Sequence, residues 1–161
     1  MPFFVWLRNV SRRTLKAFVP NLAKPDDAFA KARLRAAEWP LYAAMDSRDR
    51  DHACEVAKAV MAAGGAEQLV RAALLHDVGK TGNFKPLERI LVHLYLAAGL
   101  SGDVAPGLSY AARRNLEHAA YGAELIRRAG GCERVAELVA RHHAPGEDAE
   151  AKLLERIERQ F

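Results

Sequence analysis

Hydrophobic and polar positions along the chain repeat with the period of an α-helix almost everywhere. Alternating strand-like runs are absent, and alanine, leucine, arginine and glutamate dominate the periodic stretches. The pattern predicts helices at 3–19, 26–38, 50–63, 67–78, 86–99, 109–129 (one helix or a pair), 132–143 and 148–160, with a short segment at 41–46. We therefore expect an all-α protein, a compact bundle of about seven to nine helices.

Proline and glycine divide these stretches. Trp39-Pro40 is expected to end the helix at 26–38, because the residue before a proline disfavours the helical conformation. Loops are predicted at 80–86, 99–108 and 144–148. We expect residues 1–39 to form a helical extension and residues 40–161 to form one compact domain.

Composition excludes several classes of protein. The 161 residues are 50% hydrophobic and 27% charged, which is ordinary for a globular domain and argues against disorder, collagen, coiled-coil arrays and disulfide scaffolds. The formal net charge of +4 suits an anionic substrate or a membrane surface, but it does not by itself indicate a nucleic acid as partner.

The two cysteines, Cys54 and Cys132, lie far apart and lack the spacing of a metal finger, which is typical of a reduced, intracellular protein. We interpret both as packing residues. The longest apolar run, 90–100, contains His93 and is too short to cross a bilayer. With no recognisable signal peptide, we expect a soluble cytoplasmic protein.

The positions of the six histidines are the main indication of a functional site. Leu74-Leu75 precede His76-Asp77, and Leu138-Val139 stand shortly before a second pair of histidines. Both pairs therefore end apolar, core-facing helices. The full set is His52, His76, His93, His118, His142 and His143. Facing helices of a bundle can bring such side chains together, and bundle cores are common places for metal sites.

Each element also has an ordinary structural interpretation. A lone histidine on a helix is usually satisfied or solvated, and a His-Asp pair at a helix end can simply answer the helix dipole. These interpretations are less convincing for several such residues at the ends of apolar helices. Burying a polar group there costs a few kcal/mol unless it has a partner. A metal ion is the partner that satisfies several such groups at once.

Taken together, these residues resemble the HD-domain metal-dependent phosphohydrolases, an all-helical superfamily. The early histidine of that pattern matches His52, the stretch from Ala72 to Lys80 closely resembles the central His-Asp motif, and His118 matches the middle histidine. His142-His143 match the later pair, as in the two-metal branch that includes the cyclic-dinucleotide phosphodiesterases. The resemblance covers about residues 40–160.

Two departures from the pattern matter. Family members often carry an aspartate where Glu158 stands, so the glutamate either ligates through its longer side chain or points to solvent. The cyclic-di-GMP branch carries Gly-Tyr-Pro after its histidine pair, whereas this chain has Ala144-Pro145-Gly146. That difference argues against cyclic-di-GMP as the substrate, though not against phosphodiester chemistry.

The resemblance implies a ligand set. His52 and His76, with Glu158 if it reaches, would hold one divalent metal, and His118, His142 and His143 would hold a second, with Asp77 bridging because a carboxylate has two oxygens. Such a pair of metals can generate a hydroxide and stabilise displacement at phosphorus. The imidazole-rich set favours Fe or Mn, with Co, Ni and Zn as alternatives and Mg less suited.

Cationic side chains near this set are candidates for the substrate phosphate. In the resembled family a lysine at the place of Lys80 meets the phosphate or the catalytic hydroxide, so Lys80 joins Asp77 as a catalytic candidate. Arg141, Arg50 and Arg48 are weaker candidates, since surface arginine is the ordinary expectation. His93 falls outside the motif. Asp51 either orients His52 or caps its helix.

Three functions remain open at this stage. The leading hypothesis is a phosphohydrolase acting on a phosphomonoester or phosphodiester, expected to be a nucleotide. The second is a degenerate domain that binds metal or nucleotide without turnover, and the third is a basic helical protein with incidental histidines. The aromatic and basic residues of 3–19 favour packing or homodimerisation over contact with an anionic membrane.

Overall fold

The computed structural model describes residues 23–80 and 106–161, with side chains in the second range described from Glu117 onward. All regular structure in these ranges is helical, which confirms the predicted all-α class. The described elements are α2 (Asp27–Lys31), α3 (Trp39–Ala43), α4 (Ser47–Ala62), α5 (Glu67–Leu75), the 3-10 helix η2 (Val78–Lys80), α7 (Pro106–Arg128), α8 (Glu133–Arg141) and α9 (Ala149–Glu158). The predicted helices 3–19 and 86–99, His93 and most of loops 80–86 and 99–108 lie outside the described residues.

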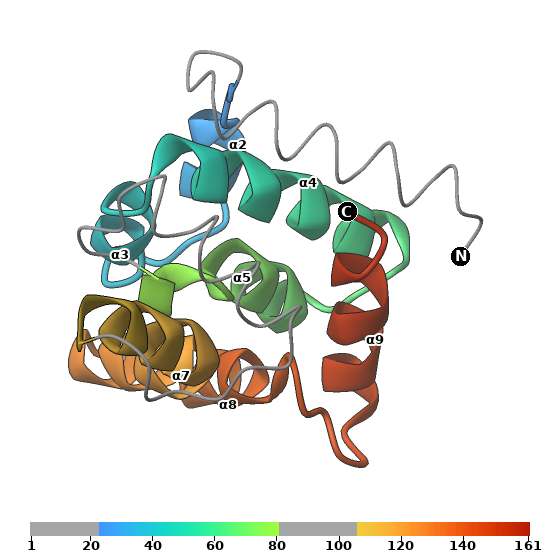
Figure 1. The fold of residues 1–161 in the computed structure, drawn as a ribbon. Coiled ribbons are helices and arrows are strands. Elements are labelled where there is room, and N and C mark those ends of the chain that lie inside the picture. Colours follow the sequence, from blue (N-terminus) through green and yellow to red (C-terminus); the bar gives the residue numbers. More distant parts are fainter. Residues whose placement is uncertain (1–22, 81–105) are drawn as a thin grey trace.

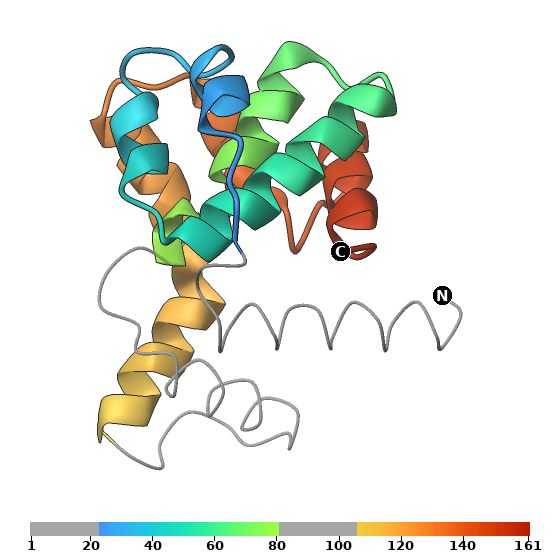
Figure 2. The same cartoon turned by 90° about the horizontal axis from the view of Figure 1, so that it is seen from above.

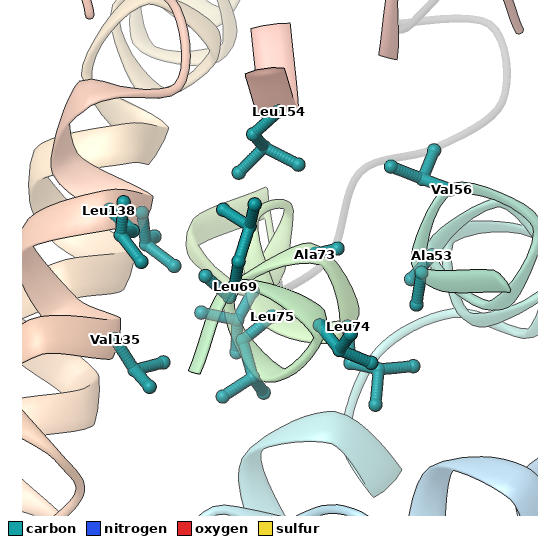
Figure 3. Packing of buried hydrophobic residues seen from close by; sticks show 14 of the residues in the cluster. Ala53, Val56, Leu69, Ala73, Leu74, Leu75, Val135, Leu138 and Leu154 are labelled. Atoms are coloured by element: carbon teal, nitrogen blue, oxygen red, sulfur yellow. The ribbon is translucent and has the colours of Figure 1, made fainter. Parts of the chain in front are cut away.

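Helix α5 lies at the centre of the bundle and contacts α3, α4, α8 and α9 (Figure 1). Every residue from Leu69 to Leu75 is buried, so this part of the helix is enclosed on all sides. Figure 3 shows its leucines between Ala53 and Val56 of α4, Val135 and Leu138 of α8, and Leu154 of α9. Because α5 is held by several neighbours, the residues at its C-terminal end occupy a fixed position.

The long helix α7 packs along α8 and against η2. Figure 2 shows that its first half extends past the other helices, while its second half lies within the bundle. Residues 106–108, which the sequence predicts as loop, belong to this helix. A proline in the first helical turn costs no intrahelical hydrogen bond, so Pro106 can begin this helix.

The predicted helix at 26–38 is wrong in its extent. Helix α2 ends at Lys31, a series of turns follows, and Pro40 lies in the first turn of α3 instead of terminating a helix. The carboxylate of Glu38 accepts a hydrogen bond from the Arg35 backbone N–H (3.0 Å) and points inward to Arg71. This buried ion pair outweighs the local helical preference.

Aspartate side chains cap the starts of two helices. The Asp46 carboxylate accepts from the backbone N–H of Arg48 (3.0 Å) at the start of α4, and the Asp148 carboxylate accepts from the backbone N–H groups of Glu150 and Ala151 (3.1 Å each) at the start of α9.

Within the described ranges, no helix combines the length and apolarity needed to cross a membrane.

Part of the predicted N-terminal extension belongs to the bundle core. Ala30 is fully buried and Leu34 nearly so, in the same cluster as α5. Tyr42 is fully buried as well, and its hydroxyl donates to Asp27 of α2 (3.0 Å). The polypeptide from α2 onward therefore packs as part of the body that carries the histidines.

Candidate metal centre

Three helices deliver their C-terminal ends to one region of the molecule. His76 is the C-cap of α5, His142 is the C-cap of α8, and Glu158 is the last residue of α9. A helix C-terminus carries a partial negative charge from its free carbonyl groups. The backbone alone therefore makes this region favourable for a cation.

The first group of potential ligands comprises His52, His76 and Glu158, whose donor atoms lie within 4.8 Å of one another. His76 is fully buried, and its Nδ1 faces the carbonyl oxygen of Ala73 at 2.8 Å. Because a carbonyl only accepts, Nδ1 is the nitrogen that carries the proton in the neutral ring, and Nε2 then offers its lone pair. That lone pair has no hydrogen-bond partner and faces Glu158 Oε1 at 4.0 Å.

The second group comprises His118, His142 and His143, again with donor atoms within 4.8 Å. The Nε2 atom of His118 lies 3.2 Å from that of His142 and 3.3 Å from that of His143. His142 presents Nδ1 to the carbonyl of Val139 at 2.6 Å, so its Nε2 also carries a lone pair. Three ring nitrogens thus converge on one point.

Asp77 lies between the two groups and presents one oxygen to each. Its Oδ2 is 3.6 Å from His76 Nε2, and its Oδ1 is 3.4 Å from His118 Nε2. The Nζ atom of Lys80 lies 2.7 Å from Oδ1, although the contact lacks hydrogen-bond geometry. The groups also approach each other through His76 and His142, whose ring centroids are 5.4 Å apart.

Electrostatics favours the ionised form of Asp77 and the neutral forms of His142 and His143. Burial opposes ionisation of Asp77, but opposing causes, of which the positive charge of Lys80 is the largest, outweigh it and hold the pKa of Asp77 well below its ordinary value. Burial is the largest cause that holds the pKa of His142 well below its ordinary value. Burial lowers the pKa of His143 too, although Glu158 acts in the opposite direction. An ionised carboxylate and neutral imidazoles are the forms that bind metals.

Two glycines set the distance between η2 and α7. A Cβ atom on Gly79 would lie 1.9 Å from the backbone oxygen of His118, and one on Gly122 would lie 3.1 Å from the backbone nitrogen of Gly79. The close approach brings the Asp77–Lys80 segment against the turn of α7 that carries His118. Gly122 is not among the predicted site residues, although a glycine within a helix costs about 1 kcal/mol and is a signal of close packing.

The arginines predicted as candidates for the substrate phosphate each lie close to an aspartate in the structure. Arg50 donates to Asp27 of α2 (2.7 Å) and Arg48 to Asp46 (2.8 Å), while the exposed Arg141 lies 3.9 Å from Asp148. Their roles toward a substrate phosphate stay predictions. Cys54 is buried with its sulfur 3.2 Å from the Tyr42 hydroxyl, and burial raises the pKa of this thiol, which disfavours the reactive thiolate.

The donor set fits a divalent transition metal. Acceptor atoms face one another at His76, Asp77 and Glu158, where protein hydrogen bonds would have paired donors with acceptors. A cation between them would remove this repulsion. Imidazole and carboxylate donors together suit Fe, Mn, Co, Ni and Zn.

The comparisons with known proteins agree with this geometry. No curated protein and no solved structure gives a significant match. The family model described as the HD domain matches residues 50–159, which include both ligand groups, Asp77 and Lys80. The chain belongs to the HD-domain family.

Proposed function

We propose that this protein is a metal-dependent phosphohydrolase that cleaves a phosphomonoester or phosphodiester of a nucleotide. Membership in the HD-domain family supports the general class, because HD domains bind divalent metals and typically act as hydrolases. The observation that carries the proposal is the arrangement of two groups of donor atoms around the two oxygens of Asp77.

Each residue has a part in this function. His52, His76 and Glu158 would hold one metal, His118, His142 and His143 the other, and Asp77 both. When bound, the metals would supply Lewis-acid stabilisation and an activated water for displacement at phosphorus. Ala73 and Val139 fix the imidazoles of His76 and His142 by accepting their Nδ1 protons.

Lys80 is suited to bind the substrate. Its side chain is 26% exposed and starts from the last residue of η2, beside Asp77. An ammonium group on a flexible stem can reach a phosphate oxygen and neutralise its charge. We therefore assign Lys80 to the substrate phosphate, and Arg141 and Arg50 remain subordinate candidates for the same role.

The second candidate function is metal or nucleotide binding without turnover. It is favoured by Glu158, which stands where the resembled family often has aspartate and lies 4.0 Å from His76 Nε2. A longer carboxylate can ligate in a different geometry and leave the first metal less well placed for chemistry.

Metal content separates these functions. The full chain, purified without chelator and reconstituted with Mn or Fe, should contain two metals, and His118→Ala should contain one. Glu158→Ala should lose metal, whereas Glu155→Ala should not, because Glu155 is on the same helix but pairs with Arg159.

Hydrolysis completes the test. Metal-loaded protein should cleave p-nitrophenyl phosphate if it accepts monoesters, or bis(p-nitrophenyl) phosphate if it accepts diesters, before nucleotides are screened. Two bound metals without cleavage of any phosphoester would favour the binding function. Absence of metal after reconstitution would refute the phosphohydrolase and metal binding, and would leave only binding of a nucleotide without metal.

A further inference from the structure

The two ligand groups differ in charge. The first group contains the carboxylate of Glu158, whereas the second is made of three imidazoles, which bring no negative charge to a cation. The second group therefore depends on Asp77, whose Oδ1 lies 3.4 Å from His118 Nε2. A divalent cation binds more strongly where anionic oxygen is available.

The oxygen of Asp77 that faces the second group already has a cationic neighbour. Lys80 Nζ lies 2.7 Å from Oδ1, while Oδ2 faces His76 of the first group. An ammonium at this distance competes with a metal for the same lone pairs and repels it. The contact thus opposes a metal in the second group more than one in the first.

We propose that the two metals bind in a fixed order, and that the second metal binds only by displacing Lys80 from Asp77. The first metal would enter the group with Glu158, in which His76 faces Oδ2, whereas the Asp77 oxygen nearest Lys80 Nζ is Oδ1. The second then separates the ammonium from Oδ1, and the free ammonium becomes available to the substrate phosphate. This inference rests on the proposed function and adds an order of assembly to it.

Lys80 is able to make this movement. It ends η2, and its unbranched side chain is partly exposed, so several rotamers can direct Nζ away from Asp77. Gly79, by contrast, is packed against the backbone of α7, so the peptide that carries Lys80 is held in place. The displacement is therefore a side-chain event that leaves the ligand groups intact.

Calorimetric titration with Mn²⁺ tests the order. The full chain, stripped of metal, should bind in two resolved steps. Lys80→Met should strengthen the second step about tenfold and change the first less than twofold. Lys80→Arg should keep the weak second step of the parent. Lys58→Met is the matched control, because Lys58 also pairs with an aspartate, Asp26 (2.6 Å), but lies outside both groups.

The outcomes distinguish the two proposals. Equal strengthening of both steps in Lys80→Met would indicate a general field effect and overturn the displacement. Unchanged affinities, or a single unresolved step in the parent, would overturn it as well. In each of these cases two bound metals would still support the proposed function, whereas absence of metal binding would refute both.

Chemical labelling of lysine gives a second readout. Acetylation of Lys80, followed by mass spectrometry, should be slow in metal-free protein, remain slow with one equivalent of Mn²⁺ and accelerate with the second. The labelling rate of Lys58 should stay constant throughout. Acceleration of Lys80 labelling with the first equivalent, or no acceleration at all, would contradict the ordered displacement.

Discussion

Two buried polar clusters in this bundle differ in how their hydrogen-bonding groups are paired. Glu38 and Arg71 form an ion pair with side chains 0% and 3% exposed. Arg71 donates from Nε (2.9 Å) and Nη2, and Glu38 also accepts from the backbone N–H groups of Arg35 (3.0 Å) and Cys132 (3.4 Å). In this cluster each acceptor faces donors.

The candidate metal centre is arranged in the opposite way. The unpaired Nε2 of His76 faces carboxylate oxygens, and three imidazole nitrogens face one another. Both clusters are costly to bury, but in the second cluster His76 Nε2 and Asp77 Oδ1 have no hydrogen-bond partner. Buried acceptors without a donor therefore distinguish a site suited to a cation from polar residues that hold the fold together.

The largest expected effect is a loss of stability when the buried Glu38–Arg71 pair is broken. Glu38→Gln leaves the buried guanidinium of Arg71 without its counter-charge, so we expect the free energy of unfolding to fall by about 3–5 kcal/mol. Urea denaturation in the presence of a chelator measures this. The double variant Glu38→Leu with Arg71→Met should recover much of the loss. A cost below about 1 kcal/mol for Glu38→Gln would show that the pair does not stabilise the fold.

The next largest effect is expected at the close contact between Gly79 of η2 and the backbone of α7 at His118. Gly79→Ala places a methyl group against the backbone of His118 and should destabilise the protein by about 3 kcal/mol, the upper range for overpacking. Gly122→Ala, with a nearest contact of 3.1 Å, should cost less. Both variants should lower metal affinity at equal folded fraction. Full metal binding by folded Gly79→Ala would show that this close approach does not position the ligands.

Metal binding should stabilise the parent by about 2.7 kcal/mol at a free concentration one hundred times the dissociation constant. His142→Leu should lose the part of this gain that the second metal supplies, while the first group still binds its metal, and should be no less stable than the parent in chelator. Leucine avoids the cost of burying an imidazole, which offsets the lost contact with His118 Nε2 (3.2 Å), and the carbonyl of Val139 still accepts from the backbone N–H of residue 142 (3.5 Å). Thermal unfolding with and without Mn²⁺ measures both. If His142→Leu in chelator were destabilised as much as Glu38→Gln, the metal centre would also stabilise the fold, and the proposed difference between the two clusters would be wrong.

The smallest effect is the pH dependence of a satisfied surface network. Hydrogen bonds from Arg134 lower the pKa of Asp148 to about 2. Because the folded-state pKa is depressed, this stabilisation is present above the unfolded pKa and is lost as pH falls from about 4 to about 2. We expect a loss of about 1 kcal/mol, screened by solvent, which Asp148→Asn should abolish while retaining the helix cap. An unchanged pH profile in that variant would assign the acid sensitivity to other carboxylates.

The helical class and the residues with metal-binding chemistry could be predicted from the sequence. Helical periodicity is local, so it revealed most of the helices, and the order of His52, His76-Asp77, His118 and His142-His143 identified the family that the comparison confirms. It also divided the donors into the two groups that the structure brings together, although their role as ligands stays a prediction.

The side chains that meet across the bundle could not be predicted from the sequence and depend on how the helices pack. Sequence left open whether Glu158 turns inward, and the packing of α9 on α4 and α5 directs it toward His76. The buried Glu38–Arg71 pair divided a predicted helix, and the contact of Gly79 with α7 fixed the position of Lys80. The physical reason is that periodicity and capping act over a few residues, whereas the pairing of buried charges and the approach of two backbones depend on residues distant in the chain.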